Sequence, residues 1–157
     1  MQVTRAADYA VRGVLYLASA GSRVTFIKDI SKGTMVPEKY LAKILQGLTK
    51  AGILRSARGV GGGFSLGRSP KEITLWEVVE AVDGPLWLTP CLERPGECGM
   101  QDECPTTDVW DRVRKDIISV LTGINFQDLL KAQSIKRQNG NPAKKAGGAM
   151  KKAGRQA

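Results

Sequence analysis

All three cysteines of this 157-residue chain lie close together, at Cys91, Cys98 and Cys104. The residues between them are rich in Gly, Pro and acidic side chains, which is typical of a loop. Thiolates this close can bind one metal centre, and an odd number cannot all be used in internal disulfides. Zinc usually needs a fourth Cys or His, and the chain has no His, whereas an iron–sulfur cluster accepts a non-cysteine ligand more readily. Cluster and zinc both stay open, as do a cysteine pair with a spare thiol and three unrelated thiols.

The composition, with 42% apolar residues, is sufficient for one globular domain with an appendage. No apolar run approaches the roughly 20 residues that a membrane-spanning helix needs, and the first residues lack the apolar stretch of a secretion signal. We therefore expect a cytoplasmic protein without a membrane partner. Thiols stay reduced in the cytoplasm, where clustered cysteines are more often metal ligands than disulfides.

The net charge of +9 is distributed unevenly. Residues 1–72 hold 12 basic and 4 acidic side chains, residues 73–135 hold 5 and 11, and residues 136–157 hold 7 and none. A basic first half indicates a polyanionic partner, most simply nucleic acid, although it could also be a solvated surface. The cysteines lie in the acidic middle.

The elements before the cysteines resemble a helix-turn-helix. Periodicity predicts a helix from Thr4 to about Ala20, then a short one over residues 26–32 with Thr25 as its N-cap. Pro37 opens a third helix of about fourteen residues, in which Lys39, Lys43, Gln46 and Lys50 share one face. That face could bind DNA, or it could belong to an ordinary amphipathic surface helix.

A glycine-rich hairpin follows the third helix. We expect strands over residues 53–56 and 64–66, with a turn between them and Arg55, Arg58 and Arg68 beside it. This order predicts a winged helix-turn-helix, in which the arginines neutralise phosphates and the glycines let the backbone approach DNA. The run leads into a strand and lacks a Lys-Ser/Thr pair, so it is not a nucleotide-binding loop.

The remaining elements are helical. Thr74 caps a fourth helix, and a long amphipathic helix runs from about Asp108 to Leu121 after the cysteines. Its apolar seam could pack on its own domain or pair with a second copy. The seam consists of Trp110, Val113, Ile117, Val120, Leu121 and Ile124. Asn125 caps a last short helix, and residues from about Ser134 onward should be disordered.

This order of parts resembles the Rrf-two superfamily of bacterial winged-helix transcription regulators, which includes IscR-like iron–sulfur regulators and NsrR-like nitric-oxide sensors. The resemblance covers residues 1 to about 130. It is carried by Asp8-Tyr9-Ala10-Val11-Arg12, Pro37-Glu38-Lys39-Tyr40-Leu41, the wing from Arg58 to Leu66, Val78 to Gly84, the three-cysteine loop, Cys104-Pro105-Thr106 and Asp108-Val109-Trp110.

The resemblance implies a mainly α fold with a small β-hairpin wing. Its divisions would be a DNA-binding domain over residues 1–84, a cysteine-bearing sensor loop over 85–107, a dimerisation helix and a short terminal helix over 108–133, and a basic disordered tail over 134–157. A homodimer would bind a palindromic operator in double-stranded DNA. The residues that we expect to contact DNA are Lys39, Tyr40, Lys43, Gln46, Lys50, Arg55, Arg58, Gly59, Gly61 and Gly62.

The resemblance also implies that the cysteines hold a [4Fe-4S] or [2Fe-2S] cluster whose state controls DNA binding. IscR-like members carry a His where this chain has Thr107, which excludes an IscR-type ligand set, and the first cysteine gap is six residues instead of the commonest five. In NsrR-like members an Asp at the position of Asp8 reaches the cluster of the opposite subunit. Asp8 is therefore the candidate fourth ligand, although it could simply pair with Arg5 or Arg12.

The sequence thus predicts a dimeric transcription regulator, most simply a repressor, controlled by a cluster that senses nitric oxide, redox state or iron supply. The alternative is a winged-helix regulator whose cysteine loop holds zinc or bare thiols. An enzyme is the third possibility. We do not expect one, because the chain lacks a His base, a Cys-x-x-Cys pair and a nucleotide-binding fingerprint.

Overall fold

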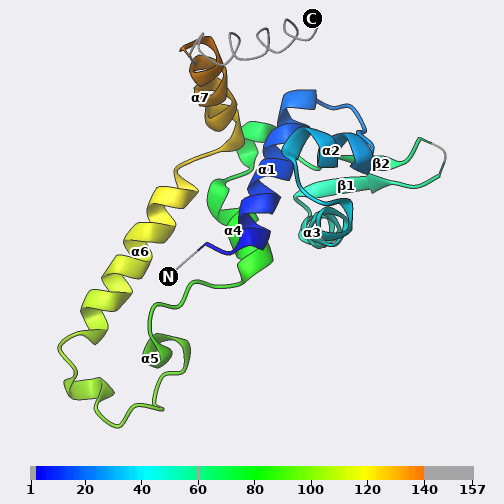
Figure 1. Ribbon diagram of the computed structural model, residues 1–157. Coiled ribbons are helices and arrows are strands. Elements are labelled where there is room, and N and C mark those ends of the chain that lie inside the picture. Colours follow the sequence, from blue (N-terminus) through cyan, green and yellow to red (C-terminus); the bar gives the residue numbers. More distant parts are fainter. Residues whose placement is uncertain (1–2, 60, 140–157) are drawn as a thin grey trace, which may run out of the picture.

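The computed structural model describes residues 3–59 and 61–139 (Figure 1). Its element order is α1 (Arg5–Ala20), α2 (Ile27–Thr34), α3 (Glu38–Lys50), β1 (Leu54–Ala57), β2 (Gly63–Leu66), η1 (Pro70–Glu72), α4 (Leu75–Asp83), α5 (Pro90–Glu93), η2 (Gln101–Glu103), α6 (Thr107–Thr122) and α7 (Phe126–Asn139). The prediction of a mainly helical fold with one antiparallel hairpin is confirmed.

The core lies between α1, α3 and α4, and α1 packs against both of the others. α1 contributes Val14 and Leu17, and α3 contributes Leu41, Leu45 and Leu48, all of them inaccessible to solvent. Leu41, Leu45 and Leu48 follow helical spacing, so burying this stripe turns the opposite face of α3 toward water. Packing of the apolar stripe therefore exposes the polar face of α3.

α2 begins and ends later than predicted. Phe26 is its N-cap, and Met35, in the left-handed conformation with φ 57°, is its C-cap. Thr25 does not cap α2, because its backbone pairs with Phe64 through N–O distances of 2.8 and 2.9 Å. Sequence periodicity gives no sign of this pairing, which adds a short third segment to the wing.

The hairpin is antiparallel, with Leu54 opposite Leu66 and Ala57 opposite Gly63. A Cβ atom at Gly63 would lie 2.3 Å from the carbonyl oxygen of Thr25. Only glycine fits this approach, so the residue is needed where the loop before α2 meets the wing.

Residues 85–123 leave the core and return to it; we call them the arm, and we call residues 3–84 with 124–139 the core unit. Figure 1 shows the arm extending from the end of α4 through α5 and back along α6. The chain rejoins the core unit through Leu75 N to Ile124 O (2.8 Å) and Phe126 N to Ile73 O (3.1 Å). Phe126 is fully buried in the same hydrophobic core as α1 and α3, so α7 packs with the core unit. The sequence-based division had placed residues 108–133 outside the DNA-binding domain of residues 1–84.

α7 is longer than predicted, because residues 134–139 are helical. The Ser134 hydroxyl donates to the carbonyl of Leu130 at 3.0 Å, and Lys136 and Arg137 lie in the last turn, where cations favour the helix dipole. The prediction of disorder from Ser134 is therefore wrong for these six residues. The remainder of the expected tail, residues 140–157, lies outside the described residues.

Candidate nucleic-acid interface and cysteine segment

α3 presents its polar face to solvent. The expected contact residues Lys39, Lys43, Gln46 and Lys50 are all exposed, and 67% of the Tyr40 side chain is accessible. Within the described part of the chain, none of the ion pairs uses these three lysines. Their charges are therefore free to neutralise phosphates.

The wing carries two further exposed arginines, Arg55 and Arg58. Gly59 and Gly61 both have a φ of 93°, a region that side chains with a Cβ atom rarely adopt, and Gly62 N donates to Gly59 O at 2.9 Å. The result is a tight tip without side chains at these glycines. Such a tip lets the backbone approach a sugar-phosphate chain closely.

Unlike those of Arg55 and Arg58 within the described residues, the side chain of Arg68 is engaged in hydrogen bonds within the protein. Its guanidinium donates to Glu77 Oε1 at 2.8 Å and to the Glu72 carbonyl at 3.2 Å. Burial would raise the pKa of Glu77, but hydrogen bonds from Thr74 and Arg68 outweigh that effect and lower it. Arg68 therefore holds the N-terminus of α4, where Thr74 and Glu77 cap the helix reciprocally.

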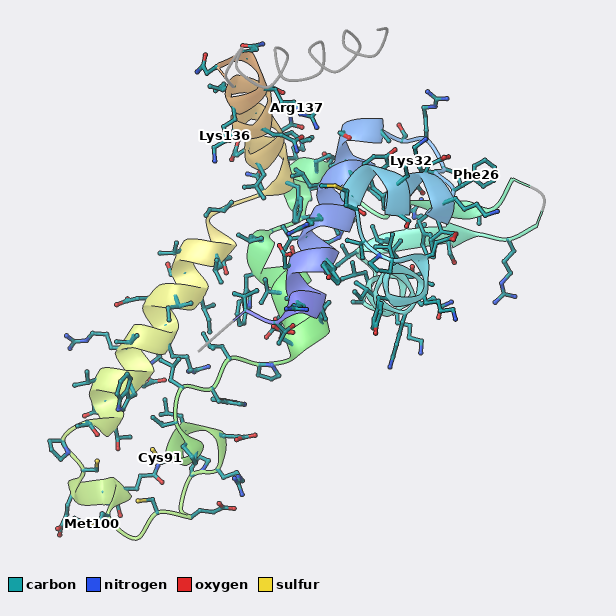
Figure 2. All side chains as sticks on the ribbon, in the orientation of Figure 1. Phe26, Lys32, Cys91, Met100, Lys136 and Arg137 are labelled. Atoms are coloured by element: carbon teal, nitrogen blue, oxygen red, sulfur yellow. The ribbon has the colours of Figure 1, made fainter. Side chains whose placement is uncertain are left out.

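The N-terminus of α2 lies beside the wing, which the sequence did not indicate. A groove of about 420 Å³ separates them, and its lining includes Lys28, Ser56 and Gly62. Phe26 is 50% exposed at its edge, and Figure 2 shows Phe26 at the start of α2 beside the wing. The Thr25–Phe64 pairing creates this neighbourhood. Lys28 therefore joins the candidate DNA contacts.

The cysteine segment occupies the far end of the arm. Figure 2 shows Cys91 and Met100 there, away from Phe26 and Lys32. Cys91 is half-buried in α5, Cys98 is exposed, and Cys104 is half-buried just before α6. All three are free thiols. In the described residues, no three His, Cys, Asp or Glu side chains converge as a metal-binding group.

Cys104 has the most perturbed environment of the three thiols. The Thr106 hydroxyl lies 3.3 Å from its sulfur. Hydrogen bonds from the side chain and backbone of Thr106 lower the pKa of Cys104 from 9.0 to about 7, because they favour the thiolate. A low thiol pKa is typical of cysteines that bind metals or react.

Asp8 lies in the first turn of α1, and its Oδ2 is 2.7 Å from Nη2 of Arg12. Both side chains are about half exposed. This is the ion pair that the sequence left open as an alternative to metal binding. Ligation of a cluster by Asp8 of a second subunit stays a prediction.

α6 has no buried residue over its whole length. Val113 and Val120 of the predicted seam are 37% and 63% exposed, and Trp110 is 42% exposed. The seam is completed by Ile117, Leu121 and Ile124, which are partly buried. The Arg114 guanidinium stacks 4.8 Å from the ring centroid of Trp87, which attaches the start of the arm to α6.

Comparison with protein families identifies the family of this chain. The Rrf2 family, described as an iron-dependent transcriptional regulator, matches residues 3–132. The chain belongs to the Rrf2 family. It is therefore a DNA-binding transcription regulator and not an enzyme. Within the described residues, no helix is long and apolar enough to cross a membrane.

Curated proteins similar to this Rrf2 member include Protein aau3 of Rhizobium meliloti, which is 36% identical over 85% of this chain and 87% of its own. The transcriptional regulator IscR of Xenorhabdus nematophila is 33% identical over 86% of this chain and 82% of its own. Both similarities extend across the core unit and the arm.

Two solved structures align with this chain over most of its length. IscR of T. potens aligns with a TM-score of 0.67 and 28% identity over 85% of this chain and 88% of its own. CymR, the global cysteine regulator of B. subtilis, aligns with a TM-score of 0.65 over 84% of this chain and 98% of its own. At 24% identity the second comparison shows the fold alone.

Proposed function

We propose that this Rrf2 regulator is a homodimer whose binding to a palindromic operator is controlled by an iron–sulfur cluster in the arm. The observation that carries the proposal is the set of three accessible, unpaired thiols gathered in one segment of the arm. The family description as iron-dependent and the similarity to proteins named IscR support it.

The donors suit a cluster by their chemistry. Thiolates are the usual cluster ligands, and Cys104 is already biased toward the thiolate form. Thr107 also contributes to lowering the pKa of the Cys104 thiol through its side chain and backbone. When bound, a cluster supplies a centre that reacts with oxidants and nitric oxide.

The segment can rearrange to bring the three sulfurs together. Its own contacts are short-range, including Arg94–Glu97 at 3.0 Å and Gly96 N to Gln101 Oε1 at 2.8 Å. No residue of the segment is buried. Within the segment, convergence breaks exposed interactions that contribute little to stability, and α5 keeps its contacts with α6 as the more distant restraint.

The exposed apolar seam of α6 supports the dimer. Sixteen helical residues with an apolar seam and no buried side chain leave a face that water solvates poorly. A second copy that pairs along Trp110, Val113, Ile117, Val120, Leu121 and Ile124 would cover that face. Two copies then present two copies of α3 and two wings, which suits an operator with two related half-sites.

Anaerobic purification tests the cluster. Protein produced with ample iron should absorb visible light and contain iron with acid-labile sulfide. Replacing any one of Cys91, Cys98 or Cys104 by Ser should lower the content of both, whereas Met100→Leu in the same segment should not.

Colourless protein that contains zinc, or no metal, would overturn cluster control. The zinc or bare-thiol regulator would then be the better account of the arm, and the membership of the Rrf2 family would be unaffected. A cluster whose loss leaves operator affinity unchanged would also contradict the proposal.

A further inference from the structure

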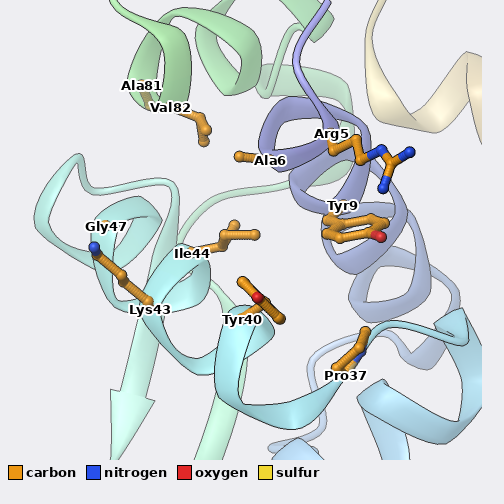
Figure 3. A pocket seen from close by; sticks show the side chains of 10 residues that line it. All are labelled: Arg5, Ala6, Tyr9, Pro37, Tyr40, Lys43, Ile44, Gly47, Ala81 and Val82. Carbon is orange, nitrogen blue, oxygen red and sulfur yellow. The ribbon is translucent and has the colours of Figure 1, made fainter.

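A groove of about 650 Å³ opens between α1, α3 and α4 in the core unit (Figure 3). It contains none of the cysteines. Its volume lies within the range of small-molecule sites, which is about 300–1,000 Å³. The residues that line it are Arg5, Ala6, Tyr9, Pro37, Tyr40, Lys43, Ile44, Gly47, Ala81 and Val82.

The groove has an apolar wall and a positive rim. Figure 3 shows the Tyr9 and Tyr40 rings and the Ile44 side chain around one space, with Arg5 to one side and Lys43 to the other. No acidic side chain lines it. An apolar wall flanked by two cations favours a ligand with an apolar body and an anionic group.

The walls are held in place by contacts outside the groove. Thr4 donates from its backbone N (3.3 Å) and its hydroxyl (2.5 Å) to the Asp83 carboxylate, which joins the start of α1 to the end of α4. The Arg12 guanidinium lies 5.9 Å from the centroid of the Tyr9 ring and is itself paired with Asp8. Walls fixed in this way reduce the ordering cost that a ligand must overcome.

We propose that this groove binds a small organic anion with an aromatic or branched aliphatic body, as an effector separate from the cysteine segment. Arg5 and Lys43 attract the anionic group, and the body lies against Tyr9, Tyr40 and Ile44. Tyr40 and Lys43 also belong to the expected DNA contacts on α3. A bound anion removes Lys43 from the phosphates, so ligand and operator compete.

The groove can be blocked without disturbing the core. Gly47 lines it on α3, and a Cβ atom there would meet nothing within 4 Å. Gly47→Leu therefore places a side chain in the groove without a core clash. Ala51→Leu, at the exposed end of the same helix and outside the groove, is the matched control.

The probe is 2-naphthoate, added to the full chain and followed by the backbone amide signals in NMR spectra. We expect shifts at Tyr9, Tyr40, Ile44 and Gly47. Gly47→Leu should weaken binding about tenfold or more, because the body of the probe loses its space, while Ala51→Leu should bind as the parent does. Neutral 2-naphthalenemethanol should bind about tenfold more weakly, because it lacks the charge.

Three results would overturn the proposal. The first is the absence of shifts in the groove up to the solubility limit of the probe. The second is equal affinity of Gly47→Leu and the parent, or of the neutral and charged probes. The third is a change of oligomeric state in Gly47→Leu, measured by sedimentation, which would assign the groove to a second copy of the chain. None of these results depends on whether the arm binds a cluster.

Discussion

The core unit and the arm differ in how their apolar side chains are covered. Every buried hydrophobic side chain of the described residues belongs to the core unit, from Ala7 to Val79 together with Phe126. The arm has none, although α6 carries a seam of valine, isoleucine and tryptophan. The core unit buries its apolar side chains within a single chain, whereas the arm leaves its own at least partly exposed; the proposed second copy and cluster would cover them.

This difference suits a regulator. A close-packed core is hard to compress and transmits strain, whereas an element with few buried contacts rearranges at low cost. The arm starts at the end of α4 and rejoins the core unit beside the start of α4, and α4 packs against both α1 and α3, so these contacts offer a route from the arm to α3. The predictions below test this division.

The largest effect should come from a cavity in the core unit. Leu45→Ala removes a fully buried side chain of α3 and should lower the free energy of unfolding by about 2–5 kcal/mol. Chemical denaturation followed by circular dichroism measures it. Ile118→Ala on α6, which removes the same number of carbon atoms, is the control, because the side chain of Ile118 is only partly covered. Equal losses for the two variants would contradict the contrast between the regions.

Disrupting the seam of α6 should separate the subunits while leaving each folded. Val113→Glu and Val120→Glu place charges on the exposed apolar face, where pairing with a second copy would bury them. Sedimentation should then report monomers, and operator affinity should fall by about tenfold or more, because the two half-sites are no longer bound together. Ser119→Glu, exposed on the same helix, should stay dimeric. Persistent dimers of both valine variants would place the interface elsewhere.

Among the expected DNA contacts, replacing a phosphate-contacting residue and replacing a base-contacting residue should have different effects. Arg58→Ala should weaken binding to all sequences alike and reduce the slope of log affinity against log salt by about 1. Gln46→Ala should cost about 1–3 kcal/mol at one base pair and relax preference there. Binding titrations at several salt concentrations measure both, with Lys115→Ala on the arm as control. Unchanged binding in both variants would remove α3 and the wing from the interface.

Asp8 offers a test of cluster ligation, because its ion pair with Arg12 can be removed by replacing either residue. Both Asp8→Ala and Arg12→Ala remove a contact between half-exposed groups, which should cost only a few tenths of a kcal/mol. Only Asp8→Ala removes a carboxylate. If Asp8 binds the cluster, only that variant should change the visible spectrum and uncouple operator affinity from cluster state. Identical spectra in the parent and Asp8→Ala would exclude the carboxylate as ligand.

The smallest effect concerns one thiol. Thr106→Ala removes the hydroxyl hydrogen bond that favours the Cys104 thiolate, so the pKa should rise from about 7 toward 9.0. The pH midpoint of alkylation measures it in metal-free protein with Cys91 and Cys98 replaced by Ser. Thr89→Ala, beside Cys91, should leave the midpoint unchanged. An unaltered midpoint in Thr106→Ala would show that the hydroxyl does not set the reactivity of Cys104.

Local patterns determined much of this protein. The spacing of Leu41, Leu45 and Leu48 placed the lysines of α3 on the solvent side, and Thr74 and Asn125 cap helices as predicted. Thr4, predicted as the first helical residue, is the N-cap of α1. These features depend on neighbours three or four residues apart, so the sequence carries them directly. The three cysteines likewise carry the proposal for the arm, because thiols limit which groups that segment can bind.

Tertiary structure decided what depends on distant partners. Only the three-dimensional structure shows that Thr25 pairs with Phe64 and does not cap α2. The same is true of the ion pair between Arg68 and Glu77 and of the burial of Phe126 in the core unit. The groove between α1, α3 and α4 has the same origin, since its walls come from three segments that are distant from one another in the sequence. Such contacts have no period along the chain, because they are chosen by the burial of apolar area and the satisfaction of backbone hydrogen bonds across the whole fold.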